Sequence, residues 1–397
     1  MKKEFWILTS FATIASIASS MVMQYIPIFG REIGMKVALV GFLVFVFYGM
    51  DTLARIPIGS FSDIIGYDKV VLIGGVAMIL ASVFYLLSMG LPKFLFLGQI
   101  FFGLGFSMTW VTIPSFITVT DQSLPKYTFF VSLGWLLGPL LGGWIRDTWD
   151  MYTLFIVFSG SSIILMLHSI GFYKFYSHKD ISENEPTAIT PNEIVYNTIT
   201  SFRDAFKVLL KGGRVAIAVS VSFVMFMSFS MAFSLIPIYL GAIGLSSFLV
   251  GSFNSSRMGC ATIIKLAVRK IIDKIGDVNA LTIGMIGTGI PIFLIPLTEY
   301  YPLIILYSVI WGLTGGMYFP IVLDLIAKDT TKKERGVALG LRGTIGTLGS
   351  ALGALIFSFL ADQFSINFSL QVVGIFVVIA AIVIFFSWKF YMKPKEG

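Results

Sequence analysis

The stretches SDIIGY (residues 62–67) and IDKIGD (residues 272–277) carry the pattern from which the fold can be predicted. Each places an aspartate three residues before a glycine, at positions 63 and 66 in the first copy and at 273 and 276 in the second. Both copies interrupt long apolar runs. The same polar turn therefore recurs at an offset of 210 residues, which indicates an internal duplication.

Other short patterns repeat at the same offset. IPI at residues 26–28 returns at 236–238, VG at 40–41 returns at 250–251, and IG at 73–74 returns at 283–284. One register thus holds across three apolar runs of each half. Two parallel repeats of this kind are typical of transporters whose halves move around a central site.

The composition places the chain in a membrane. Its 397 residues are 56% hydrophobic and 12% charged, with a mean hydropathy of +0.90. Runs of about 20 apolar residues, long enough to cross the hydrocarbon layer as helices, recur along the chain. The expected spans are roughly 5–29, 37–59, 69–90, 93–118, 127–145, 151–173, 215–240, 246–268, 278–298, 301–326, 336–361 and 366–391. We expect an all-α membrane protein with twelve transmembrane helices in two pseudo-symmetric six-helix bundles.

A hydrophilic segment separates the two sets of six spans. The predicted domains are a bundle over 1–173, a cytoplasmic linker over 174–213 and a second bundle over 214–397. Within the linker, Thr190, Pro191 and Glu193 form a helix start, and apolar residues follow at helical spacing. The linker is therefore expected to hold an amphipathic helix on the membrane surface.

The positive charges predict the orientation. Outside the spans, only Arg31, Lys36, Lys93 and Arg146 fall in the loops on the side opposite the termini. The positive-inside rule then places both termini in the cytoplasm, in a multi-pass protein of the plasma membrane. The net charge of +7 follows from this topology and does not indicate nucleic-acid binding.

The first turn resembles a known family motif. GSFSDIIGYDK (residues 59–69) is similar to the signature loop of the major facilitator superfamily, whose pattern is G-x-L-x-D-R-x-G-R-R. Gly59, Asp63 and Gly66 match this pattern. Ile64 and the pair after Gly66 stand where basic residues are usual, so Lys69 is the only nearby cation.

The fifth span carries a second resemblance. In GWLLGPLLGG (residues 134–143), Gly134, Gly138, Pro139, Gly142 and Gly143 match the glycine-proline motif of proton-coupled drug antiporters in that superfamily. Small residues of this kind let helix backbones touch, and proline permits a bend.

A third motif departs from the antiporter pattern. The proton-coupled members usually carry an arginine four residues before a glycine of the fourth span, and this chain has Gln99 before Gly103.

The resemblance implies that the turn acts as a latch. Asp63 would then pack against the start of the eleventh span, where the helix dipole and Arg335 or Arg342 attract it. Lys69 would pair with Asp121, and Asp273 and Gly276 would form the equivalent turn of the second half. The alternative is a solvated tight turn without a gating role.

Five charged residues lie inside spans: Asp51, Arg55, Arg257, Asp324 and Arg342. Such charges are costly in hydrocarbon and should face a partner or a water-filled cavity. Asp51 and Arg55 are four residues apart and can pair on one helix face. That pair is either structural or a protonation switch centred on Asp51. Asp324 and Arg342 are expected to serve in gating or structural pairing.

Arg257 lies near the middle of the eighth span beside Asn254. We expect it to face a cavity, where it binds substrate or pairs with an acid, and its planar fork suits a carboxylate or phosphate. Further cavity candidates are aromatic or amide residues near mid-span: Gln24, Tyr25, Trp110, Trp135, Trp311 and Tyr318.

These features favour a secondary transporter of a small organic solute, with proton-coupled efflux as the leading form. An importer or facilitator of the same fold is the alternative, and a non-transporting membrane sensor is a further one. The chain has no HExxH motif, no Walker loop and only two histidines, so neither an enzyme nor a metal site is expected. The expected partners are the solute, lipid and protons, with no cofactor or nucleic acid, in a monomeric protein.

Overall fold

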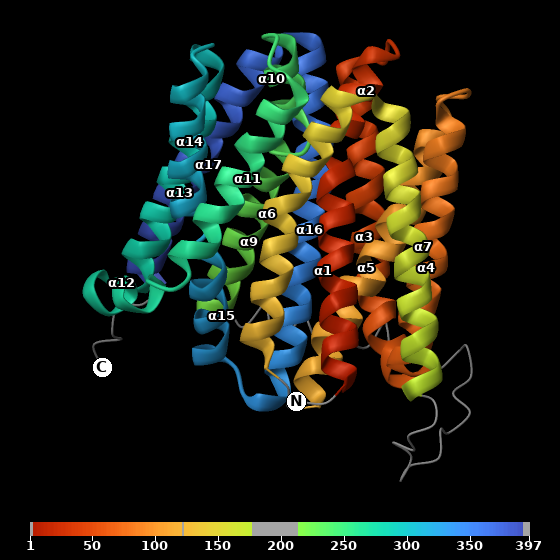
Figure 1. The fold of residues 1–397 in the computed structure, drawn as a ribbon. Coiled ribbons are helices and arrows are strands. Elements are labelled where there is room, and N and C mark those ends of the chain that lie inside the picture. Colours follow the sequence, from red (N-terminus) through yellow and green to blue (C-terminus); the bar gives the residue numbers. More distant parts are fainter. Residues whose placement is uncertain (1–2, 121–122, 177–212, 392–397) are drawn as a thin grey trace. The chain divides into compact units, whose positions relative to one another are not determined.

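The computed structural model describes residues 3–120, 123–176 and 213–391, and in these ranges every regular element is a helix (Figure 1). The first half contains α1 (Lys3–Met23), α2 (Tyr25–Glu32), α3 (Val37–Ile65), α4 (Tyr67–Ser88), α5 (Phe94–Val119), α6 (Leu124–Thr148) and α7 (Met151–Tyr176). The second half contains α9 (Gly213–Met231), α10 (Leu235–Ala242), α11 (Ser247–Ile264), α12 (Val268–Ile275), α13 (Asp277–Leu294), the 3-10 helix η1 (Ile295–Leu297), α14 (Tyr301–Gly315), α15 (Tyr318–Asp329), α16 (Lys332–Gln363) and α17 (Ile366–Tyr391).

The helices are long enough to cross a membrane. In the described ranges, 11 helical segments have the length and apolar composition of a span. Three of these consist of two α-helices in succession, namely α1 with α2, α9 with α10 and α14 with α15, and a fourth joins α13 to η1. The remaining expected span is α11, which is less apolar because it carries Asn254 and Arg257 among several serines. With α11 included, the described residues contain the twelve helical segments expected of this fold.

The chain forms two compact units. Unit 1 comprises residues 1–33, 46–200 and 246–251, and unit 2 comprises 34–45, 201–245 and 252–397, each with the described residues of those ranges. Helices α3 and α11 therefore each begin in one unit and continue in the other. The division into units therefore does not fall at the linker alone, because the first residues of these two helices are grouped with the other unit.

In unit 1, α1 and α6 lie side by side along a seam of small residues (Figure 1). A side chain at Gly138 would overlap Ser20 Oγ and the Ile17 carbonyl, and one at Gly134 would overlap Ser16. Ser20 Oγ donates a hydrogen bond to the Gly134 carbonyl at 3.2 Å. The glycines of the glycine-proline motif thus leave room for the backbones of α1 and α6 to approach each other closely.

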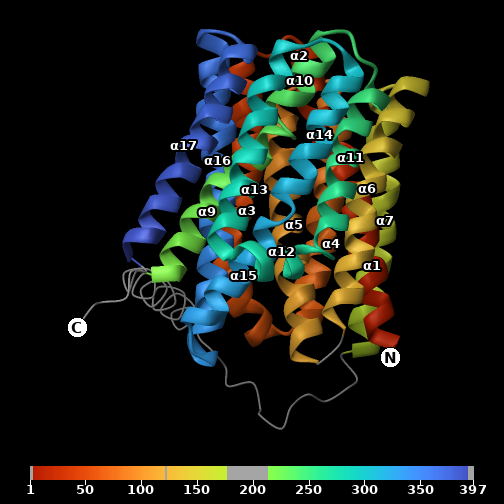
Figure 2. The same ribbon diagram turned by 90° about the vertical axis from the view of Figure 1, so that its left-hand side faces the viewer.

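Unit 2 repeats this seam between α9 and α16 (Figure 2). A side chain at Gly349 would overlap the backbone of Phe223, and one at Gly353 would meet Met227. Ser350 Oγ donates to the Phe226 carbonyl at 2.9 Å. The second seam lacks the proline but retains the small residues that permit close packing.

The repeated polar turns end at glycines with a left-handed backbone. Gly66, between α3 and α4, has φ +99°, and Gly276, between α12 and α13, has φ +82°. A residue with a Cβ atom is strained in such a backbone conformation, which explains why the repeat keeps glycine at both places. The surroundings of Gly59 and Asp63, the residue Asp121, and the helix expected after Thr190 lie outside the described residues, so the latch remains a prediction.

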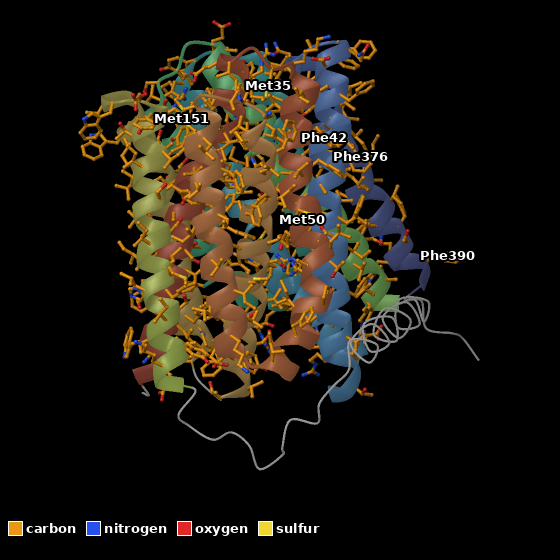
Figure 3. All side chains as sticks on the ribbon, turned by 90° about the vertical axis from the view of Figure 1, so that its right-hand side faces the viewer. Met35, Phe42, Met50, Met151, Phe376 and Phe390 are labelled. Carbon is orange, nitrogen blue, oxygen red and sulfur yellow. The ribbon has the colours of Figure 1, made fainter. Side chains whose placement is uncertain are left out.

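The outer surface is apolar. Phe42 on α3 and Phe376 and Phe390 on α17 are exposed, and their positions are labelled in Figure 3. Many further Leu, Ile, Val and Phe side chains are exposed in the same way. A soluble monomer rarely exposes so much apolar surface, whereas lipid covers it in a membrane protein.

The α1–α6 seam gives a stability prediction. We expect Gly138→Ala to destabilise the protein by about 1 to 3 kcal/mol, because the added methyl group overpacks a site walled by backbone. Gly160→Ala is the matched control, since Gly160 lies in α7 with open space around it. Thermal unfolding of the two variants in the same detergent measures the difference. Equal midpoints would contradict the proposed close contact.

Candidate functional site

A cavity of about 190 Å³ lies within unit 2. Residues of α9, α11, α14 and α15, Lys265 just after α11, and the break between α14 and α15 form its wall. Its lining includes Phe226, Phe229, Arg257, Lys265, Trp311 and Tyr318. A larger and more open hollow of about 600 Å³ lies beside η1 and residues 298–300, and residues of α10 and α17 also line it. We favour the smaller cavity because the buried Arg257 and several aromatic rings line it.

Arg257 occupies the wall of this cavity and is only 4% exposed. Its guanidinium carbon lies 4.9 Å from the ring centroid of Trp311 and 5.0 Å from that of Phe229. Its Nε and Nη2 donate to Asn254 Oδ1 at 3.3 and 3.2 Å. Asn254 Nδ2 in turn donates to the carbonyl of Ala232 at 2.8 Å, in the break between α9 and α10. A third ring, that of Phe233, has its centroid 5.7 Å away, so three rings and the amide contact the guanidinium.

Arg342 of α16 is a second buried cation next to the cavity wall. Its Nε donates to Ser222 Oγ at 3.1 Å, and its Nη2 donates to the Tyr318 hydroxyl at 3.0 Å. Its guanidinium carbon also lies 4.6 Å from the ring centroid of Phe319 and 5.4 Å from that of Phe226. Tyr318, Phe319 and Phe226 line the cavity, so Arg342 supports the cavity wall from behind.

Asp324 and Arg342, the residues predicted to serve in gating or structural pairing, have different partners. Asp324 pairs with Lys328 at 2.6 Å, and Lys328 also contacts Asp277 at 2.7 Å. Arg342 has hydroxyl and ring partners instead of a carboxylate among the residues the structure describes. The exposed pair Arg269 and Asp273 is 3.7 Å apart.

In unit 1, Asp51 and Arg55 form the ion pair expected from their spacing. Arg55 Nη2 lies 2.9 Å from Asp51 Oδ2, and Asp51 is fully buried. Ser107 Oγ donates to the backbone carbonyl of Asp51 at 3.3 Å. The second carboxylate oxygen, Oδ1, is buried without a hydrogen-bond partner in the part of the chain that the structure describes. This oxygen is a natural place for a proton, because an unsatisfied buried charge is costly.

The other predicted cavity residues lie in unit 1. Trp110 and Trp135 pack with ring centroids 6.1 Å apart. Gln24 Nε2 donates to the Pro139 carbonyl at 3.3 Å, and the Tyr25 hydroxyl lies 2.8 Å from the same oxygen. Gln24 and Tyr25 therefore join the α1–α2 break to the glycine-proline motif of α6. Of the six predicted aromatic and amide residues, Trp311 and Tyr318 line the cavity of unit 2. Gln24 and Tyr25 contact the motif of α6, and Trp110 and Trp135 pack against each other.

Two carboxylates that the sequence analysis missed cap helix starts. Asp147 accepts hydrogen bonds from the backbone N–H groups of Ser247 and Phe248, at 2.7 and 2.8 Å. Asp362 accepts one from the Val37 N–H at 3.1 Å. These contacts satisfy donors at the first turns of α11 and α3, where a negative charge also suits the helix dipole.

A positional signal for these caps exists in the sequence. Asp147 and Asp362 stand at the same distance after Gly134 and Gly349, the equivalent glycines of the two seams. The caps thus follow the internal repeat.

Comparison with known proteins places the chain in a family. The model of the Major Facilitator Superfamily matches residues 8–276 and, in a second match, 243–397. An MFS-type transporter of Methanocaldococcus jannaschii is 21% identical over 384 residues, which are 95% of each chain. The quinolone resistance protein NorA of Staphylococcus aureus is 28% identical over 144 residues, which are 35% of this chain and 36% of NorA.

Solved structures share the fold. The nucleoside transporter NupG superposes with a TM-score of 0.72 at 14% identity, covering 99% of this chain and 100% of NupG. A POT family transporter in complex with a thioalcohol-conjugated peptide superposes with a TM-score of 0.71 at 15% identity, covering 98% and 95%. At such low identity these likenesses concern the fold alone.

The Asp51–Arg55 pair gives a second prediction. Arg55→Gln leaves a buried carboxylate without its cation, and we expect it to cost about 3 kcal/mol or more. The double variant Asp51→Asn, Arg55→Gln removes both charges and should recover most of that loss. Thermal unfolding of the single and double variants measures this coupling. A double variant no more stable than Arg55→Gln would show that the pair is not a coupled unit.

The carboxylate caps give a third prediction. Asp147→Ala should destabilise the protein by about 1 kcal/mol, because two backbone donors of α11 lose their acceptor. Asp273→Ala is the control, since its exposed ion pair should contribute less than about 1 kcal/mol. Chemical or thermal unfolding at one pH compares them, and an equal effect would argue against the cap.

Proposed function

The chain belongs to the major facilitator superfamily, and from this membership we propose that it exports a small organic solute by alternating access in exchange for protons. The family itself establishes the broader class, a multi-pass membrane transporter. Its relatives are transporters and not enzymes. Direction, coupling and the solute binding site are the parts that we propose.

The similarity to NorA is the observation that carries the proposal of efflux. NorA is a quinolone resistance protein, and 144 residues of it align with this chain at 28% identity. The glycine-proline motif, which resembles that of proton-coupled drug antiporters, forms the packed α1–α6 seam. Both observations support export of the solute over import by a symporter or facilitator of the same fold.

Asp51 is the proposed coupling residue. It is a fully buried acid with one oxygen held by Arg55 and the other without a hydrogen-bond donor in the described residues. Protonation of Asp51 removes its negative charge and weakens its ion pair with Arg55. Because a buried charge needs its partner, protonation would switch the pair between a closed and a released arrangement.

The solute would bind in the cavity of unit 2. Arg257, Trp311 and Tyr318 are the proposed contact residues, and Asn254 orients Arg257. The break between α14 and α15 lies in the same wall, and discontinuous helices often mark the substrate site of a transporter.

We also propose a location in the plasma membrane with both termini in the cytoplasm, as the distribution of cations predicts. The proposed protein acts as a monomer surrounded by lipid. The exposed apolar side chains support the lipid contact.

Import by the same fold is the second candidate, and Gln99 is the observation that favours it. Gln99 is buried in α5 at the position where proton-coupled members usually carry an arginine. A symporter or facilitator needs no antiport machinery there. A test of coupling must therefore distinguish the two directions.

Proteoliposomes with an imposed pH gradient provide this test. With an acidic lumen and a fluorescent quinolone outside, we expect at least fivefold more accumulation than in empty liposomes, because outward protons drive the solute inward. Asp51→Asn should abolish accumulation driven by the gradient yet spare counterflow, which needs no net proton movement. Asp150→Asn, an exposed acid beyond α6, is the control and should leave both unchanged.

Two results would contradict parts of this proposal. Gradient-driven accumulation that is unaltered in Asp51→Asn would contradict the coupling role of that residue. Accumulation that requires the opposite gradient would favour the importer.

A further inference from the structure

We propose that α12 and the turn before it bind an anionic membrane lipid, with the lipid headgroup on the basic face of α12 and the acyl chains against the apolar side chains exposed where α11 ends. The site belongs to unit 2 alone. It goes beyond the proposed function, because it depends on neither the solute nor the direction of transport.

Helix α12 lies across the end of unit 2. After α11 ends, residues 265–267 form a turn, and α12 begins. The N–H group of Leu266 donates to the carbonyl of Ile263 at 3.1 Å in this turn. The helix then runs across the end of the bundle instead of along it, in contact with α13 and α15 (Figure 1). Because α11 spans the membrane, a helix set across its end lies where hydrocarbon and water meet.

The two faces of α12 differ in polarity. Its apolar residues follow the spacing of one helix face and are buried or half-buried: Val268, Ile271, Ile272 and Ile275. Its charged residues occupy the opposite face and are all exposed: Arg269, Lys270, Asp273 and Lys274. The apolar face therefore holds α12 on the bundle, and the charged face is available to a partner.

The exposed face of α12 carries an excess of positive charge. Arg269 lies 3.7 Å from Asp273. Lys270 and Lys274 have no acidic partner within the part of the chain that the structure describes, and Asp277, the next acid, pairs with α15 instead. The two lysines are four residues apart on one face, where like charges repel each other. An anion that contacts both lysines relieves this repulsion and stabilises the helix.

Exposed apolar side chains lie beside the basic face. Ile263, in the last turn of α11, is 64% exposed, and Leu266, in the turn, is 86% exposed. Basic residues attract the anionic headgroups of a membrane, and neighbouring apolar side chains can contact the acyl chains below them. A soluble anion would satisfy the lysines and leave Leu266 without an apolar contact. An anionic phospholipid satisfies both parts of the surface.

The first half carries no cation at the equivalent positions. At the offset of 210 residues, the three cations of α12 correspond to uncharged residues: Gly59, Ser60 and Ile64. In that half, α3 also continues through the stretch as one helix. The turn with Asp273 and Gly276 recurs in both halves, so the basic face is an addition of the second half and is not required by the repeated fold.

Two lipids with the same acyl chains test the proposal. Dioleoylphosphatidylglycerol is anionic, and dioleoylphosphatidylcholine has a phosphate without a net charge. Native mass spectrometry of the full-length protein, titrated with each lipid in one detergent, measures the dissociation constant of the first lipid bound. We expect phosphatidylglycerol to bind about tenfold more tightly than phosphatidylcholine, because lysines near a membrane surface attract net negative charge.

Variants assign this preference to α12. The double variant Lys270→Gln, Lys274→Gln should reduce the preference to about twofold, and Lys274→Gln alone to about fivefold, because each lysine contributes part of the attraction. The double variant Lys36→Gln, Lys93→Gln is the matched control, since it removes the same charge from two exposed lysines elsewhere and should leave the preference unchanged. Leu266→Ser should weaken both lipids, because it removes a contact with the acyl chains.

Two further measurements locate the lipid and identify its source. A phosphatidylglycerol with a photoreactive diazirine in one acyl chain should label residues 263–275 in the wild-type protein and label them less in the α12 double variant. An excess of glycerol 3-phosphate, which has the anionic group without acyl chains, should not displace the lipid.

Any one of four results overturns the proposal: phosphatidylcholine binds as tightly as phosphatidylglycerol, the two double variants show the same preference, the label falls outside residues 263–275, or glycerol 3-phosphate displaces the lipid. The first two exclude an anion-selective site on α12. The third places the lipid elsewhere, and the fourth shows that a soluble phosphate is sufficient. None of these measurements depends on transport, so they are separate from the test of the proposed function.

Discussion

The cost of a charge inside apolar helices is the constraint on which the arrangement of this protein depends. The chain meets it in two different ways. In unit 1, Asp51 and Arg55 neutralise each other across one helical turn. In unit 2, the guanidinium groups of Arg257 and Arg342 contact aromatic rings, hydroxyl groups and an amide. The two halves thus stabilise their buried charges through different kinds of partner.

The internal duplication explains which features recur and which differ. The left-handed glycines Gly66 and Gly276, the two seams of small residues and the capping carboxylates Asp147 and Asp362 occur in both halves. These features shape the backbone, and a repeated fold needs them twice. The buried acid Asp51 does not recur, because Ala261 occupies the equivalent position of the second half. The shared residues thus serve the architecture, and the divergent residues are the natural place to seek the solute and the proton.

Much of the fold could be predicted from the sequence, since apolar length, the position of turns and the spacing of small residues are local properties. The close contact of α6 with α1 follows from its glycines, and the pairing of Asp51 with Arg55 follows from helical spacing. The caps were missed because Asp147 meets the Ser247 backbone across about a hundred residues of chain, and no local pattern marks such a contact. The contacts of Arg342 could not be predicted from the sequence either, because its partners Ser222 and Tyr318 lie on other helices. The assignment of the first turns of α3 and α11 to the opposite unit is likewise a tertiary property.

The separation of the two charged sites has a consequence for the proposed mechanism. A transporter can exchange a proton for a solute by letting both compete for one group, or by letting each bias the same conformational change. Here Asp51 belongs to unit 1 and Arg257 to unit 2, and Arg257 does not release a proton at physiological pH. Direct competition at a shared residue is therefore excluded for this pair. In the proposed mechanism, protonation of Asp51 and occupation of the cavity would therefore each have to favour a different arrangement of the same protein.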